Sequence, residues 1–232
     1  MSSSFAQLST PEGPGSVSSA PNLPAGFTDT FTSRYVNAGG LRQHAVIGGD
    51  GPPLLLVHGW PENWYAWRFL MPTLARDFTV IAVDQRGIGL TEKTGDGYDT
   101  GTLARDLVAL MDALDHKRFA VVGHDTGYII SYALAADHRD KDVLRATFGL
   151  YRAWDTTLTQ NQQRKTQPLT IPVLGIGGEN SWGEHAGHGM EPAANDVQTA
   201  VIPGAGHWVA EQAPEEMLAA LTAFLAPYRD GG

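Results

Sequence analysis

The chain has 232 residues, of which 42% are hydrophobic and 18% are charged, and it contains no cysteine. This length predicts one globular domain, and the lack of cysteine excludes disulfides, thiolate metal sites and a cysteine nucleophile. A formal net charge of -9 has the wrong sign for binding nucleic acid or an anionic membrane surface. No apolar run is long enough to span a bilayer. The sequence therefore points to a small ligand that is not a polyanion.

The first 24 residues are rich in serine and proline, and their few apolar residues follow neither a helical nor a strand period. We expect residues 1–24 to form a flexible tail and residues 25–232 to form the folded domain. The first basic residue is Arg34, so neither the basic start of a secretory signal nor an arginine-rich presequence is recognised. This favours a cytoplasmic protein.

From Arg34 onward, short apolar runs alternate with helical patterns, which is typical of parallel strands joined by crossover helices. Most of the runs are continuously apolar, as expected for strands buried on both faces. The pattern predicts an α/β fold with a mostly parallel central sheet flanked by helices. The expected strands are Arg42–Ile47, Leu54–His58, Val80–Val83, Phe119–Val122, Val173–Ile176 and Val197–Ile202, and the expected helices are Thr102–Leu114, Tyr128–Asp137 and Pro214–Leu225.

The segment Gly123-His124-Asp125-Thr126-Gly127 places an aspartate between an apolar strand and a helix. The flanking glycines allow a sharp strand-to-helix turn, which would lift the Asp125 side chain out of the sheet at the helix N-terminus. Such a turn is typical of a nucleophile elbow. The alternative is that Asp125 is only an N-cap residue, which accepts hydrogen bonds from the first free N–H groups of the helix.

A second segment, His58-Gly59-Trp60-Pro61, ends a buried strand and favours the elbow interpretation. In such folds one oxyanion donor is the N–H of the residue after the nucleophile, here Thr126, and the other comes from this loop, here Trp60. We place His58 and Gly59 in the same oxyanion and substrate-binding group. Pro61 is a candidate for a cis peptide bond. The nearby Trp64 and Trp67 lie three residues apart and are interpreted as core residues instead.

A third segment, Pro203-Gly204-Ala205-Gly206-His207, follows the last expected strand. Its glycines would let a turn present His207 to the site, and the chain order of nucleophile before histidine is that of an α/β hydrolase. We therefore expect Asp125 and His207 to act as a pair.

These segments resemble the epoxide hydrolase branch of the α/β-hydrolase superfamily. The resemblance covers most of residues 34–228 and rests on HGWPENWYAWR (58–68), DQRGIGLTEK (84–93), GHDTGYIISYALA (123–135) and PGAGHWVAEQAPEE (203–216). It implies that Asp125 attacks an epoxide carbon to form an alkyl-enzyme ester, and that His207 activates the water that hydrolyses this ester to a vicinal diol. The implied substrates are a small apolar epoxide and water, with no cofactor.

Related dehalogenases share the aspartate elbow but carry other residues after the nucleophile. Haloalkane dehalogenases typically have tryptophan there to hold the halide, and fluoroacetate dehalogenases usually have arginine to hold a carboxylate. This chain has Thr126. The resemblance therefore favours an epoxide hydrolase, with a haloalkane or haloacid dehalogenase as the alternative enzyme.

Family members normally carry a helical cap domain, and this chain has too few residues for one. A residual cap segment is expected at about 140–169, and the resemblance makes Tyr151 an acid that protonates the opening epoxide. By resemblance Phe148–Trp154 would be the last cap helix. From the residues alone, Asp142–Leu150 could instead form a sixth strand of the sheet, and both interpretations stay open. An ordinary half-buried role for Tyr151 also stays open.

The missing cap residues also affect the prediction of the acid that should orient His207. Glu179 is the first candidate and Asp155 is the second, while the alternative for each is a solvated loop carboxylate. Because triads that lose this acid slow by orders of magnitude, we also consider a second class of function. In that alternative the chain is a lidless, inactive or ligand-binding homologue.

Three further expectations concern assembly, metals and the loop after Val83. Loss of the cap would expose apolar surface around the pocket, which predicts a homodimer. Glu184, His185, His188 and Glu191 lie in a polar loop that no hydrolase role requires, so no metal site is assigned. Arg86, in the loop beside the active-site mouth, is expected to pair with an acid.

Overall fold

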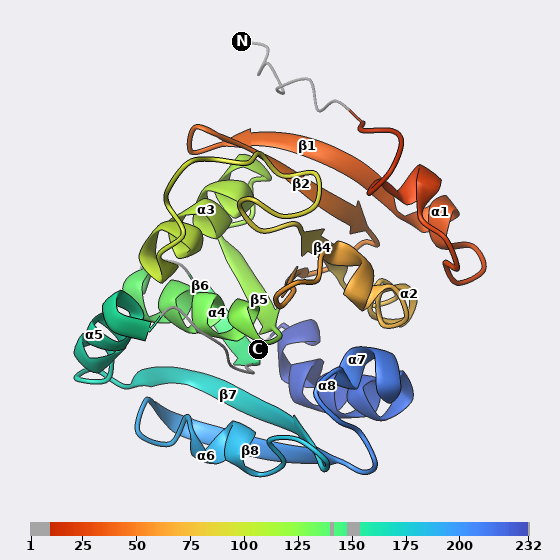
Figure 1. The fold of residues 1–232 in the computed structure, drawn as a ribbon. Coiled ribbons are helices and arrows are strands. Elements are labelled where there is room, and N and C mark those ends of the chain that lie inside the picture. Colours follow the sequence, from red (N-terminus) through yellow and green to blue (C-terminus); the bar gives the residue numbers. More distant parts are fainter. Residues whose placement is uncertain (1–9, 140–141, 148–153, 232) are drawn as a thin grey trace.

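The computed structural model describes residues 10–139, 142–147 and 154–231. Within them, eight strands form one sheet in the order β1-β2-β4-β3-β5-β6-β7-β8, with helices on both faces (Figure 1). β1 pairs with β2 and β2 pairs with β4 in antiparallel fashion, and all pairs from β4 to β8 are parallel. The predicted mostly parallel α/β architecture is confirmed. The strands are β1 Thr32–Ala38, β2 Leu41–Gly48, β3 Pro53–Val57, β4 Thr79–Val83, β5 Arg118–Gly123, β6 Asp142–Thr147, β7 Leu169–Gly178 and β8 Ala194–Ile202.

Helices cover the two faces of this sheet as separate groups. One face packs against α3 and α4, and the opposite face packs against α2, α8 and the short helix η2 (Figure 1). None of the described helices is long and apolar enough to cross a membrane. The helices are η1 Val17–Ser19, α1 Phe27–Thr30, η2 Trp64–Trp67, α2 Met71–Leu74, α3 Thr100–Ala113, α4 Thr126–Asp137, α5 Trp154–Arg164, α6 His185–His188, α7 Val209–Gln212 and α8 Pro214–Arg229.

The central strands feed both apolar layers because successive side chains of a strand point to opposite faces. Leu55 and Val57 of β3 belong to the layer under α3 and α4, whereas Leu54 and Leu56 belong to the layer under α8. Trp64 and Trp67 are buried in the second layer, which confirms their interpretation as core residues. In the register of β3 and β5, Val57 lies beside Gly123, so the loops that leave these two strands begin next to each other.

The structure decides between the helix and strand interpretations for residues 142–147. β6 runs from Asp142 to Thr147 and pairs with both β5 and β7, which confirms the strand interpretation for these residues and takes them out of the expected residual cap. A sheet with a missing central strand, the consequence of the helix interpretation, is wrong. Residues 148–153, which make up most of the last cap helix in the helix interpretation, lie outside the described residues. Between β6 and β7 the described chain holds only α5, so a full cap is absent from it.

Two features near the N-terminus differ from expectation. β1 was not predicted because its partly buried polar residues break the apolar run, although Gly39-Gly40, both with positive φ, is a strong hairpin signal. Residues 10–24 were expected to be a flexible tail, but Val17 is buried and its N–H donates to Ser33 Oγ at 3.0 Å. Widely spaced apolar residues are enough to anchor this segment. Residues 1–9 lie outside the described range.

Candidate active site

The elbow between β5 and α4 brings the Asp125 side chain to the carboxyl end of the sheet. Asp125 has φ 52° and ψ -118°, a region that non-glycine residues rarely adopt, and such backbone strain is found at functional sites. A Cβ at position 123 would collide with the Gly127 carbonyl, and one at position 127 would collide with the Val57 carbonyl. Asp125 is the N-cap residue of α4, but its carboxylate makes no capping hydrogen bond to that helix, so capping is not the role of this side chain.

The Asp125 carboxylate is held from the β3 loop. The backbone N–H of Trp60 donates to Asp125 Oδ1 at 3.0 Å, as expected for an oxyanion donor, and the Trp60-Pro61 bond is cis as predicted. Gly59 is required here because a Cβ at this position would collide with the Cβ of Asp125. Thr126 lines the cleft beside Asp125, and its role as the second donor stays a prediction.

His207 meets Asp125 from the far end of the chain. His207 Nε2 lies 3.4 Å from Asp125 Oδ2, and the His207 side chain is about one-third exposed. The loop is fixed by His124, whose Nε2 lies 2.9 Å from the His207 carbonyl oxygen. The two imidazole rings also pack together, with centroids 4.9 Å apart. The structure therefore brings together the carboxylate and imidazole that the sequence predicted to act as a pair.

A second ion pair, not predicted from the sequence, supports this arrangement. Glu62, in the loop after β3, lies with its Oε2 2.9 Å from His124 Nδ1. Burial lowers the pKa of His124, but the hydrogen bond and charge of Glu62 outweigh it, so the pKa of His124 is raised above its ordinary value. Burial likewise raises the pKa of Glu62, and the bond and charge of His124 lower it overall. His124 as a cation can donate from both ring nitrogens, to Glu62 and to the His207 carbonyl.

Replacement of Glu62 by glutamine is expected to lower the free energy of unfolding by about 2 kcal/mol, because a hydrogen bond between charged, largely buried groups is lost. The Glu62 contribution, with its pKa lowered from 4.5, is present above pH 4.5 and is lost as pH falls through the folded value. The His124 contribution, with its pKa raised from 6.5, is complete below pH 6.5 and is lost as pH rises through the folded value.

The stability difference between the wild type and Glu62→Gln should therefore be largest between pH 4.5 and 6.5 and should narrow on either side. Urea unfolding measured across this range would check it. Glu191→Gln serves as the matched control because Glu191 is exposed, and this change should leave stability within about 0.5 kcal/mol at every pH. A Glu62→Gln deficit that does not vary with pH would contradict the ion pair.

Glu179, the first candidate for the orienting acid, does not pair with His207. The Glu179 carboxylate accepts a hydrogen bond from the Gly204 N–H at 2.8 Å, at an exposed position, and makes no ion pair with His207. Glu179 therefore closes the turn after β8. Tyr151 and the side chain of Asp155 lie outside the described residues. Among the described carboxylates, Asp125 is the one that pairs with His207.

His58 does not line the cleft that borders Asp125, contrary to its expected place in the substrate-binding group. Its ring is fully buried; Nδ1 donates to the Gly59 carbonyl at 2.7 Å, and Nε2 accepts from the Gln85 N–H at 3.1 Å. Burial also lowers its pKa, which favours the neutral ring that this bonding pattern needs. His58 therefore holds together the loops after β3 and β4, which both border Asp125.

A cleft of about 760 Å³ opens beside Asp125. Its walls are largely apolar, from Trp60, Ile88, Tyr98, Leu103, Ile129 and Ile130. Arg86 also borders it, but its guanidinium makes two hydrogen bonds to Asp106, at 2.7 and 2.8 Å, which confirms the predicted pairing. An apolar cleft with its charged neighbour neutralised is suited to an uncharged apolar ligand.

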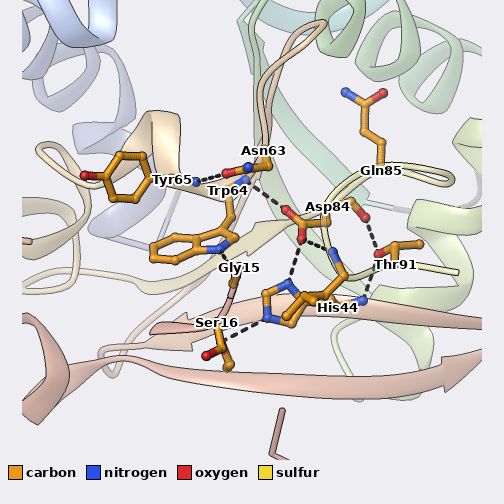
Figure 2. A network of polar contacts seen from close by, with 12 residues as sticks. Gly15, Ser16, His44, Asn63, Trp64, Tyr65, Asp84, Gln85 and Thr91 are labelled. Carbon is orange, nitrogen blue, oxygen red and sulfur yellow. Dashed lines mark hydrogen bonds and ion pairs between the residues drawn. The ribbon is translucent and has the colours of Figure 1, made fainter. Parts of the chain in front are cut away.

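The buried carboxylate of Asp84 connects the loop after β3, the loop after β4 and strand β2 through hydrogen bonds (Figure 2). It accepts hydrogen bonds from the N–H groups of Trp64 and Leu90, both at 2.9 Å, and from His44 Nδ1 at 2.8 Å. Trp64 in turn donates from Nε1 to the Gly15 carbonyl at 2.8 Å. The loops on either side of Asp125 are thus fixed to the sheet and to the N-terminal segment. This network was not predictable from the sequence because its members are scattered along the chain.

Two other expectations concern a metal site and a homodimer. Within the described residues, no three histidine, aspartate or glutamate side chains are arranged to hold a metal ion. Trp60 and Tyr98 border the cleft and are 64% and 46% exposed. Homodimer formation through this surface stays a prediction.

Comparison with known proteins agrees with this geometry. Residues 52–149 match the family model of the alpha/beta hydrolase fold. The chain is 29% identical to a soluble epoxide hydrolase of Corynebacterium sp. over 86% of this chain and 99% of that protein. It is 38% identical to a fluoroacetate dehalogenase of Burkholderia sp. and 37% identical to epoxide hydrolase B of Mycobacterium tuberculosis, each over 47% of this chain. These two matches span only 38% and 32% of the relatives.

The alignment with the Corynebacterium protein has 283 positions, more than the 232 residues of this chain, so that relative carries a long stretch without a counterpart here. This is consistent with a truncated cap. Among solved structures, the epoxide hydrolase CorEH aligns with a TM-score of 0.78 at 26% identity, covering 85% of this chain and 99% of the other. Epoxide hydrolase A of Mycobacterium thermoresistibile has the same fold, with a TM-score of 0.77 at 20% identity. The chain therefore has the α/β-hydrolase fold, and it is similar to epoxide hydrolases that share this fold.

Proposed function

We propose that the chain hydrolyses a small apolar epoxide to a vicinal diol through an ester on Asp125. The observation that carries the proposal is the position of the Asp125 carboxylate, with Oδ1 held by the Trp60 N–H and Oδ2 3.4 Å from His207. The apolar cleft beside it suits an uncharged substrate. A carboxylate can displace an epoxide oxygen as alkoxide, which divides the hydrolysis into two easier steps.

In the first step, Asp125 Oδ2 forms a bond to an epoxide carbon as the carbon–oxygen bond of the ring breaks. The alkoxide that results takes up a proton, and Tyr151 stays the proposed donor. In the second step, His207 Nε2 takes a proton from water, and the hydroxide adds to the ester carbonyl carbon. Negative charge then develops on Oδ1, where the Trp60 N–H already donates. The ester bond breaks, and the proton on His207 passes to the leaving alkoxide, which completes the diol. The carboxylic acid left on Asp125 then loses its proton, which replaces the proton that Tyr151 gave in the first step.

A single turnover in water enriched in heavy oxygen tests this mechanism. The oxygen from water should appear in the carboxylate of Asp125 after the first turnover, because water attacks the ester carbonyl and not the substrate. Mass spectrometry of the peptide that contains Asp125 measures the label, and protein incubated in the same water without substrate is the control. An active enzyme whose first-turnover diol carries the label, with none in the peptide, would rule out the ester.

The dehalogenase alternative is favoured by one observation, the 38% identity to a fluoroacetate dehalogenase over 47% of this chain. The same carboxylate could displace a halide, and heavy-oxygen labelling alone would not distinguish the two reactions. Side-by-side assays with a terminal epoxide, a haloalkane and fluoroacetate would do so through diol and halide release. Halide release without diol formation would favour a dehalogenase. A pure, folded protein that turns over none of these substrates would favour the ligand-binding alternative.

A further inference from the structure

Asp84 and His44 form a buried pair that contributes no atom to the cleft. Both residues are fully buried, and neither lines the cleft. Asp84 Oδ1 accepts a hydrogen bond from the Trp64 N–H at 2.9 Å (Figure 2). Asp84 Oδ2 accepts from the Leu90 N–H at 2.9 Å and from His44 Nδ1 at 2.8 Å. A Cβ at Gly89 would collide with the same carboxylate, so the chain after β4 passes directly against it.

His44 holds the Asp84 carboxylate in this orientation. A carboxylate only accepts hydrogen bonds, so His44 Nδ1 carries the proton and Nε2 is left as an acceptor. Nε2 lies 3.0 Å from Ser33 Oγ, whose hydroxyl can donate to it while its oxygen accepts from the Val17 N–H. Both ring nitrogens therefore have partners. Without His44, the buried carboxylate would lose one of its three donors, and an incompletely bonded buried charge is costly enough to make the side chain move.

The loop after β3 connects Asp84 to the donor on the nucleophile. Trp64 is bonded to Asp84, and four positions earlier the Trp60 N–H donates to Asp125 Oδ1 at 3.0 Å. Only residues 61–63 separate these two donors. A displacement of the backbone at Trp64 is therefore transmitted to the Trp60 N–H.

The Trp60 N–H contributes unequally to the two steps of the proposed reaction. When the ester forms, negative charge leaves the Asp125 carboxylate, so a hydrogen bond to Oδ1 weakens during this step. When water adds to the ester, negative charge develops on Oδ1, and the same hydrogen bond becomes stronger in the transition state. Loss of such a donor slows a reaction by about 10²- to 10³-fold, and a donor displaced by about 1 Å loses much of its effect. A displaced Trp60 N–H should therefore slow the second step and not the first.

We propose that Asp84, oriented by His44, is a positioning residue for hydrolysis of the ester. Through the Trp64 N–H it fixes the Trp60 N–H at the place where the oxyanion forms. The effect on rate rests on the proposed function, whereas the effect on the position of the Trp60 N–H does not. A merely structural role of Asp84 would instead lower the rates of both steps in proportion to the loss of folded protein.

The position of the Trp60 N–H is tested without substrate, by nuclear magnetic resonance of protein whose six tryptophans carry heavy nitrogen. The Trp60 amide signal is identified by its loss in Trp60→Phe. In Asp84→Ala the amides of Trp60 and Trp64 should shift and should exchange with solvent at least about 5-fold faster, because Trp64 loses its acceptor. An unchanged Trp60 amide in folded Asp84→Ala overturns the proposal, whether or not the protein hydrolyses an epoxide.

The effect on rate is tested by rapid mixing with epoxide, with the ester followed by intact-protein mass spectrometry and the diol measured in the same samples. Asp84→Ala should form the ester within about 3-fold of the wild-type rate and hydrolyse it at least about 10-fold more slowly, so the ester should accumulate. Unchanged hydrolysis of the ester, or equal slowing of both steps, overturns the positioning role. If the wild type forms no diol, the proposed function fails, and the amide signals still decide whether Asp84 positions the Trp60 N–H.

Asp84→Asn tests whether the bond to Trp64 carries the effect. Its amide oxygen can accept from the Trp64 N–H while its amide nitrogen faces His44, whose ring can accept there. Hydrolysis of the ester should therefore recover to within about 3-fold of the wild type. A folded Asp84→Asn protein that is as slow as Asp84→Ala would contradict the role of this bond.

Variants of His44 keep the proposal testable if Asp84→Ala does not fold, which circular dichroism decides. His44→Leu removes the donor to Asp84 and should slow hydrolysis of the ester at least about 5-fold, whereas His44→Asn places an amide nitrogen near Nδ1 and should restore most of the rate. Ser33→Ala is the matched control, because it removes the partner of Nε2 and leaves the bond to Asp84. It should lower stability but keep both steps within about 3-fold. If Ser33→Ala or His44→Asn is as slow as His44→Leu, the effect follows packing around the ring, and the proposal is overturned.

Discussion

Replacement of Asp125 by asparagine or alanine is expected to reduce epoxide turnover by at least about 10⁴-fold, because neither side chain can form the ester. The fold should tolerate the change. Asp125 makes no capping bond to α4, and the carboxylate bonds to the Trp60 N–H and to His207 are local to the site. The backbone strain at φ 52° remains in both variants, because asparagine and alanine also carry a Cβ, so the thermal midpoint should change little. Activity should therefore be lost while stability is retained.

The measurement is steady-state diol formation together with thermal unfolding, for Asp125→Asn and a matched surface variant. Asp196→Asn makes the same chemical change at an exposed position of β8 and should leave both quantities unchanged. Asp125→Asn protein should be tested soon after purification and its mass checked, since hydrolysis of the amide would restore the nucleophile. Full activity in Asp125→Asn with an intact amide would exclude the ester mechanism.

The parts of the site that were predictable from sequence are those carried by glycine-rich turns. Gly123 and Gly127 bracket the nucleophile, and each occupies a position where a Cβ would meet backbone. The turn before His207 and the loop that begins at Gly59 are also recognisable in the sequence, because Gly204 has a positive φ and a Cβ at Gly59 would collide with Asp125. Such constraints are local, so a single chain is sufficient to find them.

The parts that were missed depend on pairing across the fold. Glu62 and His124 are separated by 62 positions, and nothing in the spacing of either residue indicates the other. The same holds for His44 and Asp84, whose pairing needs β2 and β4 to be neighbours in the sheet. His58 was misassigned because a histidine that ends a strand next to the nucleophile can equally point to the cleft or to the loop beneath it. Glu179 was misassigned because its place directly after β7, where some family members carry the acid, does not determine where its carboxylate points.

The truncated segment between β6 and β7 limited prediction for a different reason. The family resemblance placed cap residues there, while the apolar residues of Asp142–Leu150 favoured a strand, and the two inferences use the same residues. The register of β6 with β5 and β7 favours the strand, since an open gap would leave the facing edges of β5 and β7 with unpaired backbone groups. For residues 142–147, backbone hydrogen bonding across a continuous sheet therefore decides the structure, and the family resemblance does not.

Replacement of His207 by glutamine is expected to stop the reaction after the ester on Asp125 has formed. The first step needs only the Asp125 carboxylate, so the ester should still form, whereas its hydrolysis loses the base that lies 3.4 Å from Asp125 Oδ2. Steady-state turnover should fall by about 10³- to 10⁴-fold. The glutamine side chain retains polar atoms for the partly exposed position of His207, and the loop remains fixed through the bond between His124 and the backbone carbonyl of residue 207.

Intact-protein mass spectrometry after mixing His207→Gln with excess epoxide should show one added substrate mass per chain. The same adduct should be absent from a double variant that also carries Asp125→Asn, which locates the bond on the nucleophile. Glu179→Gln is an informative companion, because its carboxylate closes the turn at Gly204 and makes no ion pair with His207. It should keep turnover within a few-fold of the wild type and should not accumulate the adduct. An adduct in Glu179→Gln would reinstate that residue as the orienting acid, and a His207→Gln protein that turns over without delay would remove the imidazole from the mechanism.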